Sequence, residues 1–143
     1  MSYTITCRVY QKNTNAWFEV IEKTVWNFAN GGSWTVVDDK HVLTMGGSGT
    51  SGILRFKCEN EYFIVALGVH NYKRWCDVST GLEPAGTATH IHPDYYTEGN
   101  VRAAVREEQL SSFDVTSPQG RKVHVNFDVP DGNHLQCSIR MSK

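Results

Sequence analysis

Residues 122–141 read KVHVNFDVPDGNHLQCSIRM, and this stretch decides the fold class. Apolar and polar side chains alternate strictly from residue 122 to 129 and again from 135 to 141. Such alternation is typical of antiparallel strands with one buried face and one wet face. The intervening PDGN has the composition of a tight turn. The stretch therefore predicts a β-hairpin.

The same period-two pattern extends over most of the chain. Residues 3–10 alternate in the same way, and turn sequences separate the other expected strands, which are 16–26, 34–37, 41–45, 53–58 and 61–69. A helix is predicted over 101–110 with Asn100 as its N-cap, and a short turn is expected from Pro93. We therefore expect a mainly β protein of two packed sheets, with a helical excursion between about 93 and 113, as a single domain over 1–143.

The composition of the chain limits the classes of binding partner that are expected. The chain has 14 basic and 15 acidic residues, and this balance gives no electrostatic reason to expect nucleic acid or anionic lipid. The opening MSYTITCRVY lacks the apolar region of a secretory signal, and no apolar run approaches the length of a membrane span. We therefore expect a cytoplasmic protein whose four cysteines are reduced thiols.

A glycine-rich loop at 47–52 spells G-x-G-x-x-G, the pattern of dinucleotide-binding folds. That function requires a helix directly after the glycines, whereas ILRF at 53–56 predicts a strand. No cofactor is therefore expected. Two interpretations remain, a flexible hairpin connection or a backbone that approaches a ligand closely, with small hydroxyls such as that of Ser48 beside it.

A second unusual stretch, GVHNYKRWCD at 68–77, follows an apolar strand and gathers many hydrogen-bonding groups. Sugar hydroxyls are recognised by amides and backbone N–H groups, and the C–H face of a pyranose packs on an aromatic ring. On this chemistry Asn71, Ser48 and the Gly49 amide are candidates for hydroxyl recognition, and Tyr72 offers a ring face. The competing interpretation is ordinary rim packing of Tyr72 and Trp75.

Metal binding, glycoside cleavage and pore formation are not favoured by the residues present. His90 and His92 would share one face of a strand beside Asp94, but zinc needs three or four ligands, so pairing with Asp94 or exposure is favoured and no metal is expected. A glycosidase pair drawn from Asp77 and the glutamates at 107–108 lacks motif and context. Pore formation requires an amphipathic N-terminal helix, whereas the chain begins with a strand pattern, so no membrane insertion is expected.

The chain resembles the fungal fruit-body lectins, the group of mushroom and bolete lectins. The matching stretches are RVYQKN, EKTVWNFANGGSW, HVLTMGGSGTSGILRF, VALGVHNYKRWCD, REEQLSS, GRKV and DGNHL, and they cover nearly the whole chain. The resemblance implies an actinoporin-like β-sandwich of two sheets joined by a short helix-loop-helix connection. It also implies two sugar sites and no catalysis.

The resemblance also implies which residues form each site. The galactose/GalNAc site, for Galβ1-3GalNAc (the T-antigen of mucin-type O-glycans), would use Ala29, Ser48, Gly49, His70, Asn71 and Tyr72. The site for terminal N-acetylglucosamine, as in GlcNAc-terminated N-glycans, would use Asp77, Val78, Thr80, Arg102 and Phe113. Phe113 departs from the family pattern, which has tyrosine there, so the ring is kept and its hydroxyl is lost.

The implied biology is glycan binding by a homo-oligomer, a tetramer or dimer, because single sugar sites are weak and several sites on one particle supply avidity. Defence against animals that eat the fungus is the implied role. The alternative is a storage or recognition lectin in which only the first site is functional.

Overall fold

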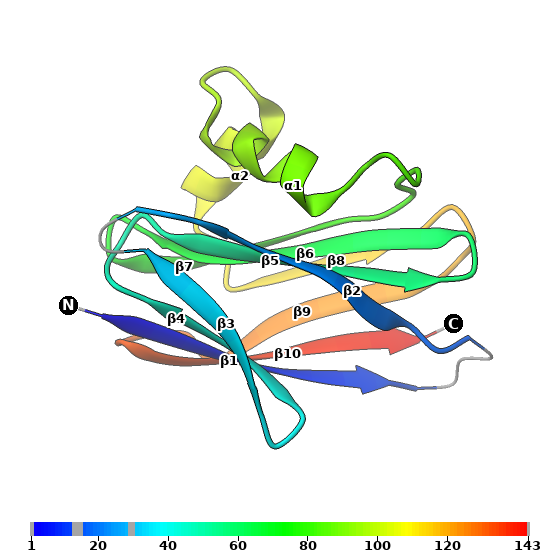
Figure 1. Ribbon diagram of the computed structural model, residues 1–143, viewed down its shortest axis with the longest axis horizontal. Coiled ribbons are helices and arrows are strands. Elements are labelled where there is room, and N and C mark those ends of the chain that lie inside the picture. Colours follow the sequence, from blue (N-terminus) through cyan, green and yellow to red (C-terminus); the bar gives the residue numbers. More distant parts are fainter. Residues whose placement is uncertain (1, 13–15, 29–30, 143) are drawn as a thin grey trace.

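The computed structural model describes residues 2–12, 16–28 and 31–142. Within these residues a six-stranded sheet, in the order β3-β4-β1-β10-β9-β8, packs against a four-stranded sheet, in the order β2-β5-β6-β7 (Figure 1). The strands are β1 Tyr3–Gln11, β2 Glu19–Trp26, β3 Gly32–Val37, β4 Lys40–Met45, β5 Ser51–Cys58, β6 Glu61–His70, β7 Lys73–Ser79, β8 Ser112–Thr116, β9 Lys122–Val129 and β10 His134–Ser142. The helical segments are α1 Ala88–Ile91, the 3-10 turn η1 His92–Tyr96, and α2 Val101–Glu108.

The predicted hairpin over 122–141 is confirmed. Strands β9 and β10 pair antiparallel, with a register shift between Gln136 and Cys137. Strand β1 lies on the other side of β10 and runs parallel to it, with Thr4 opposite His134. The first and last strands of the chain are thus neighbours inside the six-stranded sheet, and Figure 1 shows them side by side.

The main core fills the space between the sheets. In β6 the side chains of Phe63, Val65 and Leu67 point into it, while Ile64 and Ala66 point to the outer face of the four-stranded sheet. Both faces of β6 are buried, which explains why its sequence reads as a nearly continuous apolar run. The helical connection covers the outer face (Figure 1).

The helical connection predicted from the sequence is present, but its predicted residue range is only partly correct. Helix α2 begins at Val101 as expected, because the Asn100 side chain accepts a hydrogen bond from the Arg102 N–H at 2.8 Å. It ends at Glu108, because Gln109 takes a left-handed conformation with φ 53°. The first helix begins at Ala88, five residues before the expected turn at Pro93.

Two strands were missed, β7 and β8. Residues 73–79 carry Lys73, Arg74 and Asp77, and these charges hid the pattern of a strand that is mostly buried. Asp77 is tolerated there because the Tyr95 hydroxyl donates to its carboxylate at 2.6 Å. Strand β8 has five residues and lies at the sheet edge, where a short run of alternation gives a weak signal.

The four cysteines are free thiols. Cys7 and Cys137 are neighbours on the parallel strands β1 and β10, and both are buried in the main core. Burial raises the pKa of the Cys76 thiol to about 12. Across the described part of the chain, no helix is both long and apolar enough to cross a membrane.

Candidate functional site

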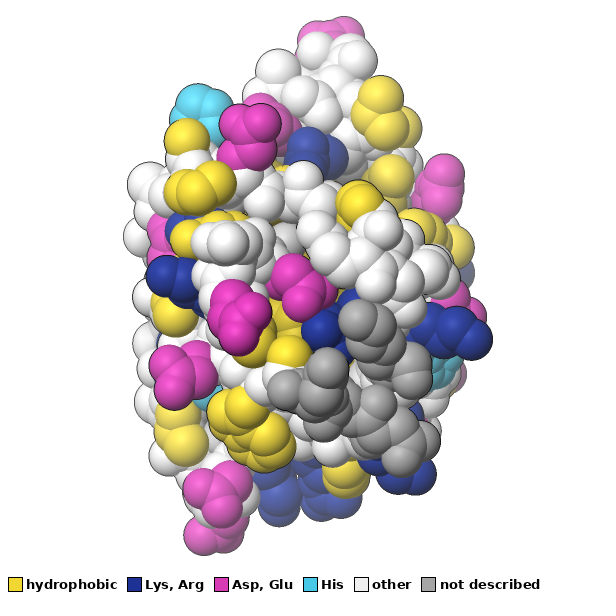
Figure 2. Space-filling model, turned by 90° about the vertical axis from the view of Figure 1, so that its right-hand side faces the viewer, with side chains coloured by type: hydrophobic (Ala, Val, Ile, Leu, Met, Phe, Trp, Pro, Cys, Tyr) yellow, Lys and Arg dark blue, Asp and Glu magenta, His cyan; other side chains and the backbone are white. Residues whose placement is uncertain are grey.

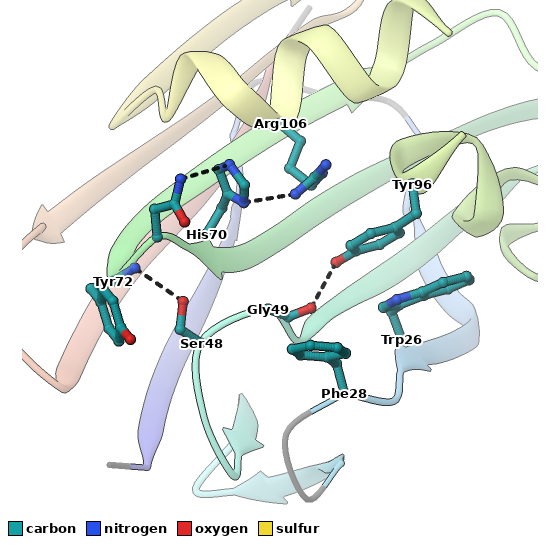
Figure 3. Close-up of a pocket in the computed structure, with 9 residues that line it drawn as sticks. Trp26, Phe28, Ser48, Gly49, His70, Tyr72, Tyr96 and Arg106 are labelled. Carbon is teal, nitrogen blue, oxygen red and sulfur yellow. Dashed lines mark hydrogen bonds between the residues drawn. The ribbon is translucent and has the colours of Figure 1, made fainter. Parts of the chain in front are cut away.

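A pocket of about 530 Å³ opens at the end of the sandwich where β6 turns into β7 (Figure 3). It brings together segments that are far apart in sequence: the end of β2, the loop before β5, the β6–β7 turn, η1 and α2. The residues that line it are Trp26, Phe28, Ser48, Gly49, His70, Asn71, Tyr72, Tyr96 and Arg106. Five of the six residues assigned to the first sugar site line it, and the sixth, Ala29, lies outside the described residues.

The β6–β7 turn has two residues, Asn71 and Tyr72, both in the left-handed region with φ 48° and 66°. This geometry matches the twist of a tight hairpin and favours asparagine and glycine, whereas a bulky aromatic residue is strained in it. The Tyr72 N–H donates to Ser48 Oγ at 3.0 Å, which fastens the turn to the glycine loop. The Tyr72 side chain remains 79% exposed, so it bears the strain with little packing in return.

The backbone conformation at position 49 and the close packing around it both require glycine. Its φ is +105°, and an added Cβ would lie 2.4 Å from the Phe28 ring. Its N–H already donates to the Val69 carbonyl at 2.8 Å, so this amide is not the free donor expected from the sequence. Ser48 Oγ accepts from Tyr72, and its own O–H remains able to donate to a ligand.

His70 connects the turn to helix α2. Arg106 Nη1 donates to its Nδ1 at 2.7 Å, so a neutral His70 carries its proton on Nε2. The Asn71 amide lies 3.3 Å from Nε2, and the N–H there needs an acceptor. The amide oxygen of Asn71 fills this role once the two ends of the amide are exchanged, which leaves the NH2 for a ligand. Burial, together with the Arg106 charge, lowers the pKa of His70 and favours this neutral form.

An aromatic wall forms the other side of the pocket (Figure 3). The rings of Trp26 and Tyr96 stack with centroids 4.3 Å apart, and the Arg106 guanidinium lies 4.8 Å from the centroid of the Tyr96 ring. Phe28 completes the wall and is largely exposed. Aromatic faces next to hydrogen-bonding groups suit a ligand that has both C–H surface and hydroxyls.

A buried histidine supports this wall from behind. His92 is 3% exposed, and its two ring nitrogens lie 2.8 Å from Thr24 Oγ1 and Ser51 Oγ. Ser51 Oγ in turn lies 2.7 Å from the Tyr96 hydroxyl, which donates to the Gly49 carbonyl at 3.3 Å. With that donation made, Ser51 donates to Tyr96 and accepts from His92, so the hydrogen bonds run in one direction toward the glycine loop.

The expected geometry of the two histidines at 90 and 92 is wrong. They lie at the end of α1 and the start of η1 instead of on a strand, because the helical connection begins before Pro93. His90 is exposed, whereas His92 turns into the sheet and pairs with hydroxyls instead of with Asp94. In the part of the chain that the structure describes, no three His, Cys, Asp or Glu residues are placed to hold a metal ion.

The residues assigned to the second sugar site are divided between the outer side of the four-stranded sheet and the main core between the sheets. Asp77 is buried beneath Tyr95 on the outer face, where Arg102 donates to Ser79 Oγ at 3.1 Å. Burial raises the pKa of the Asp77 carboxyl. The side chains of Val78 and Phe113 pack against the main core instead. Thr80, directly after β7, is partly exposed, and the assignment of this site stays a prediction.

Sequence reasoning missed four residues of the first pocket: Trp26, Phe28, Tyr96 and Arg106. Trp26 and Phe28 lie two positions apart at the end of a predicted strand, which is the signal that an exposed aromatic pair would give. Tyr96 and Arg106 reach the pocket only through the fold of the helical connection. No local pattern reveals that placement.

Together these features define a β-sandwich protein with a ligand pocket at one end. The sequence profile of the family described as fungal fruit body lectin matches residues 1–139. The chain belongs to this family of carbohydrate-binding proteins, as its motifs indicated. The Boletus edulis lectin of Boletus edulis is 51% identical over 144 residues, which cover 99% of this chain and 100% of that protein.

Solved structures confirm the actinoporin-like fold. The structure of the wild-type Xerocomus chrysenteron lectin has a TM-score of 0.95 and 53% identity, and the match covers 99% of this chain and 100% of that one. The lipid-binding protein Nakanori has a TM-score of 0.67 over 99% of this chain and 71% of its own, with 9% identity. The similarity to Nakanori concerns the fold alone.

We expect Tyr72→Gly to raise the free energy of unfolding by about 1 kcal/mol, because glycine adopts φ 66° without the steric cost that an aromatic residue bears. Urea unfolding measures the change. Asp39→Gly is the matched control, since Asp39 has φ 63° at the same position of the two-residue β3–β4 turn. Asp39→Gly should raise the free energy of unfolding by less, because aspartate tolerates the left-handed region better than tyrosine does. A destabilised Tyr72→Gly would show that the ring stabilises the fold.

Stability is expected to fall as the pH decreases from about 6.5 to about 4. Burial lowers the pKa of His92 from 6.5 to about 4, so in this window the unfolded chain binds a proton that the folded chain does not. The loss attributable to His92 is roughly 3 kcal/mol. Urea unfolding at several pH values should show a shallower pH dependence for His92→Gln than for wild type. The exposed His90→Gln is the control, and equal slopes for all three proteins would contradict the prediction.

Proposed function

We propose that the pocket binds galactose/GalNAc-type glycans, with Galβ1-3GalNAc as the ligand. One observation carries the proposal. The Tyr72 N–H donates to Ser48 Oγ, and this hydrogen bond brings Ser48 close to Asn71, the residue before Tyr72. A hydroxyl donor and an amide thus lie beside the aromatic wall, and this combination matches the hydroxyls and the C–H face of a pyranose.

The absence of catalysis is part of the proposal. His70 accepts a hydrogen bond from Arg106, and none of the described residues that line the pocket is a carboxylate. General acid/base cleavage of a glycoside uses two carboxylates, so the pocket is suited to holding a sugar unchanged. Incubation with a chromogenic galactoside should give binding without a coloured product.

A second site for terminal N-acetylglucosamine is proposed around Asp77, Thr80 and Arg102. The Arg102 guanidinium, which donates to Ser79 Oγ, and the partly exposed Thr80 directly after β7 supply polar groups near the end of this strand. Phe113 lacks the hydroxyl that the family pattern has there, so we propose that this site binds more weakly than the first. A lectin with only the first site functional remains the alternative.

The proposed biology is defence against animals that feed on the fungus, by a cytoplasmic homo-oligomer that gains avidity from repeated sites. Figure 2 shows the end of the sandwich opposite the pocket, where acidic and basic side chains are interspersed. This mixture, with a net charge of −1, gives this end no single-sign field for nucleic acid.

Calorimetry with free Galβ1-3GalNAc tests the first site without avidity. We expect Asn71→Gly to weaken binding about 10-fold or more, because it removes the amide while glycine keeps the left-handed turn. Asp38→Gly, at the matching position of the β3–β4 turn with φ 49°, should bind like wild type. Thr80→Ala should weaken binding of N-acetylglucosamine alone. Full disaccharide binding by Asn71→Gly would overturn the assignment of the first site.

A further inference from the structure

A second depression, of about 430 Å³, lies on the far side of the exposed Tyr72 side chain. It is lined by Tyr3, Tyr72, Gly132 and Asn133, so Tyr72 is common to it and to the first pocket. The first pocket is built on the four-stranded sheet and the helical connection, whereas this depression adds the β9–β10 turn and the start of β1 from the six-stranded sheet. Tyr72 thus forms a ridge between two adjacent hollows at one end of the sandwich.

The β9–β10 turn is held firmly at this position. The Thr4 N–H donates to the Asn133 carbonyl at 2.9 Å, which ties the turn to β1. Gly132 has φ +89°, and a Cβ added to it would meet no atom within 4 Å, so its backbone is open to an incoming ligand. The Asn133 side-chain amide has no hydrogen-bond partner in residues 2–12, 16–28 and 31–142, although it lines the depression.

The chemistry of the depression differs from that of the first pocket. Among its described lining residues are two phenol rings, one amide and a bare glycine backbone, and none of them is charged. The rings offer flat surfaces for C–H groups, and the amide both donates and accepts hydrogen bonds. These are the groups that recognise a neutral pyranose. The positive charge of Arg106 lies in the first pocket, on the other side of the Tyr72 ridge.

The strained conformation of Tyr72 also supports a role for its ring in binding a ligand. The turn would form more readily with glycine at this position, and the exposed ring does little for the core. A ring that borders two hollows can pack against two consecutive sugars, one on each side. This accounts for an aromatic residue at a place where backbone geometry disfavours it.

We propose that the depression lined by Tyr3, Tyr72, Gly132 and Asn133 is an extension subsite that binds a neutral hexose linked to the disaccharide in the first pocket. The subsite rests on the proposed function, since the first pocket must hold the disaccharide for the next sugar to reach Asn133. The protein then recognises neutral trisaccharides or longer glycans, and Tyr72 lies between the first pocket and the subsite.

Calorimetry with monovalent ligands tests the subsite. The ligands are Galβ1-3GalNAc and two trisaccharides that carry one extra neutral hexose, on the galactose or on the GalNAc end. We expect one trisaccharide to bind wild type about 3- to 10-fold more tightly than the disaccharide. Asn133→Ala should abolish this gain and leave the affinity for the disaccharide unchanged.

A second variant, Gly132→Asn, tests whether the effect of Asn133→Ala is due to the depression itself. Gly132→Asn places a side chain in the open space of the depression, and asparagine tolerates the positive φ, so it should also abolish the gain. Gly120→Asn is the matched control, because Gly120 has φ +83° and equally open surroundings in the β8–β9 turn. It should keep the full gain.

The two possible failures are distinguishable. Equal affinity of wild type for the disaccharide and both trisaccharides, or a gain that survives in both Asn133→Ala and Gly132→Asn, would overturn the subsite alone. Absence of binding to the disaccharide and to both trisaccharides would overturn the proposed function and the subsite with it.

Discussion

The hydrogen bond from the Tyr72 N–H to Ser48 Oγ is the interaction on which the pocket depends. It joins a glycine loop to a hairpin turn 24 residues further along the chain, and it holds two consecutive left-handed residues at the rim of the pocket. Neither segment is a site alone, since the loop contributes a hydroxyl and the turn contributes an amide and a ring. The cost of the strained turn is borne by the sandwich, whose strands β6 and β7 fix both ends of it.

The helical connection has a supporting function behind this site. It covers the outer face of the four-stranded sheet and places Tyr96 and Arg106 on the pocket side. His92 joins it to Ser51 and through Ser51 to Tyr96, so the aromatic wall is anchored to β5 by these hydrogen bonds. A neutral His92 completes this network. The pocket is therefore preorganised by the same contacts that attach the helices to the sheet, which limits the entropy lost on binding.

The sequence predicted the sandwich and the hairpin over 122–141, because alternation of apolar and polar residues is a local signal of which face is buried. It missed β7, because a buried Asp77 depends on Tyr95, a partner that no local pattern reveals. It predicted Ser48 and Asn71, which both line the pocket, through unusual composition and family resemblance. Arg106 escaped because tertiary folding alone brings α2 to the turn, and the donor role expected for Gly49 failed because β6 takes its N–H.

The central claim is that the glycine loop and the β6–β7 turn form one sugar site. A crystal structure of the protein with Galβ1-3GalNAc bound tests it most directly. The account predicts saccharide hydroxyls within hydrogen-bonding distance of Ser48 Oγ and the Asn71 amide, with a ring face against the aromatic wall. A disaccharide bound away from both segments, with the pocket empty, would contradict the claim.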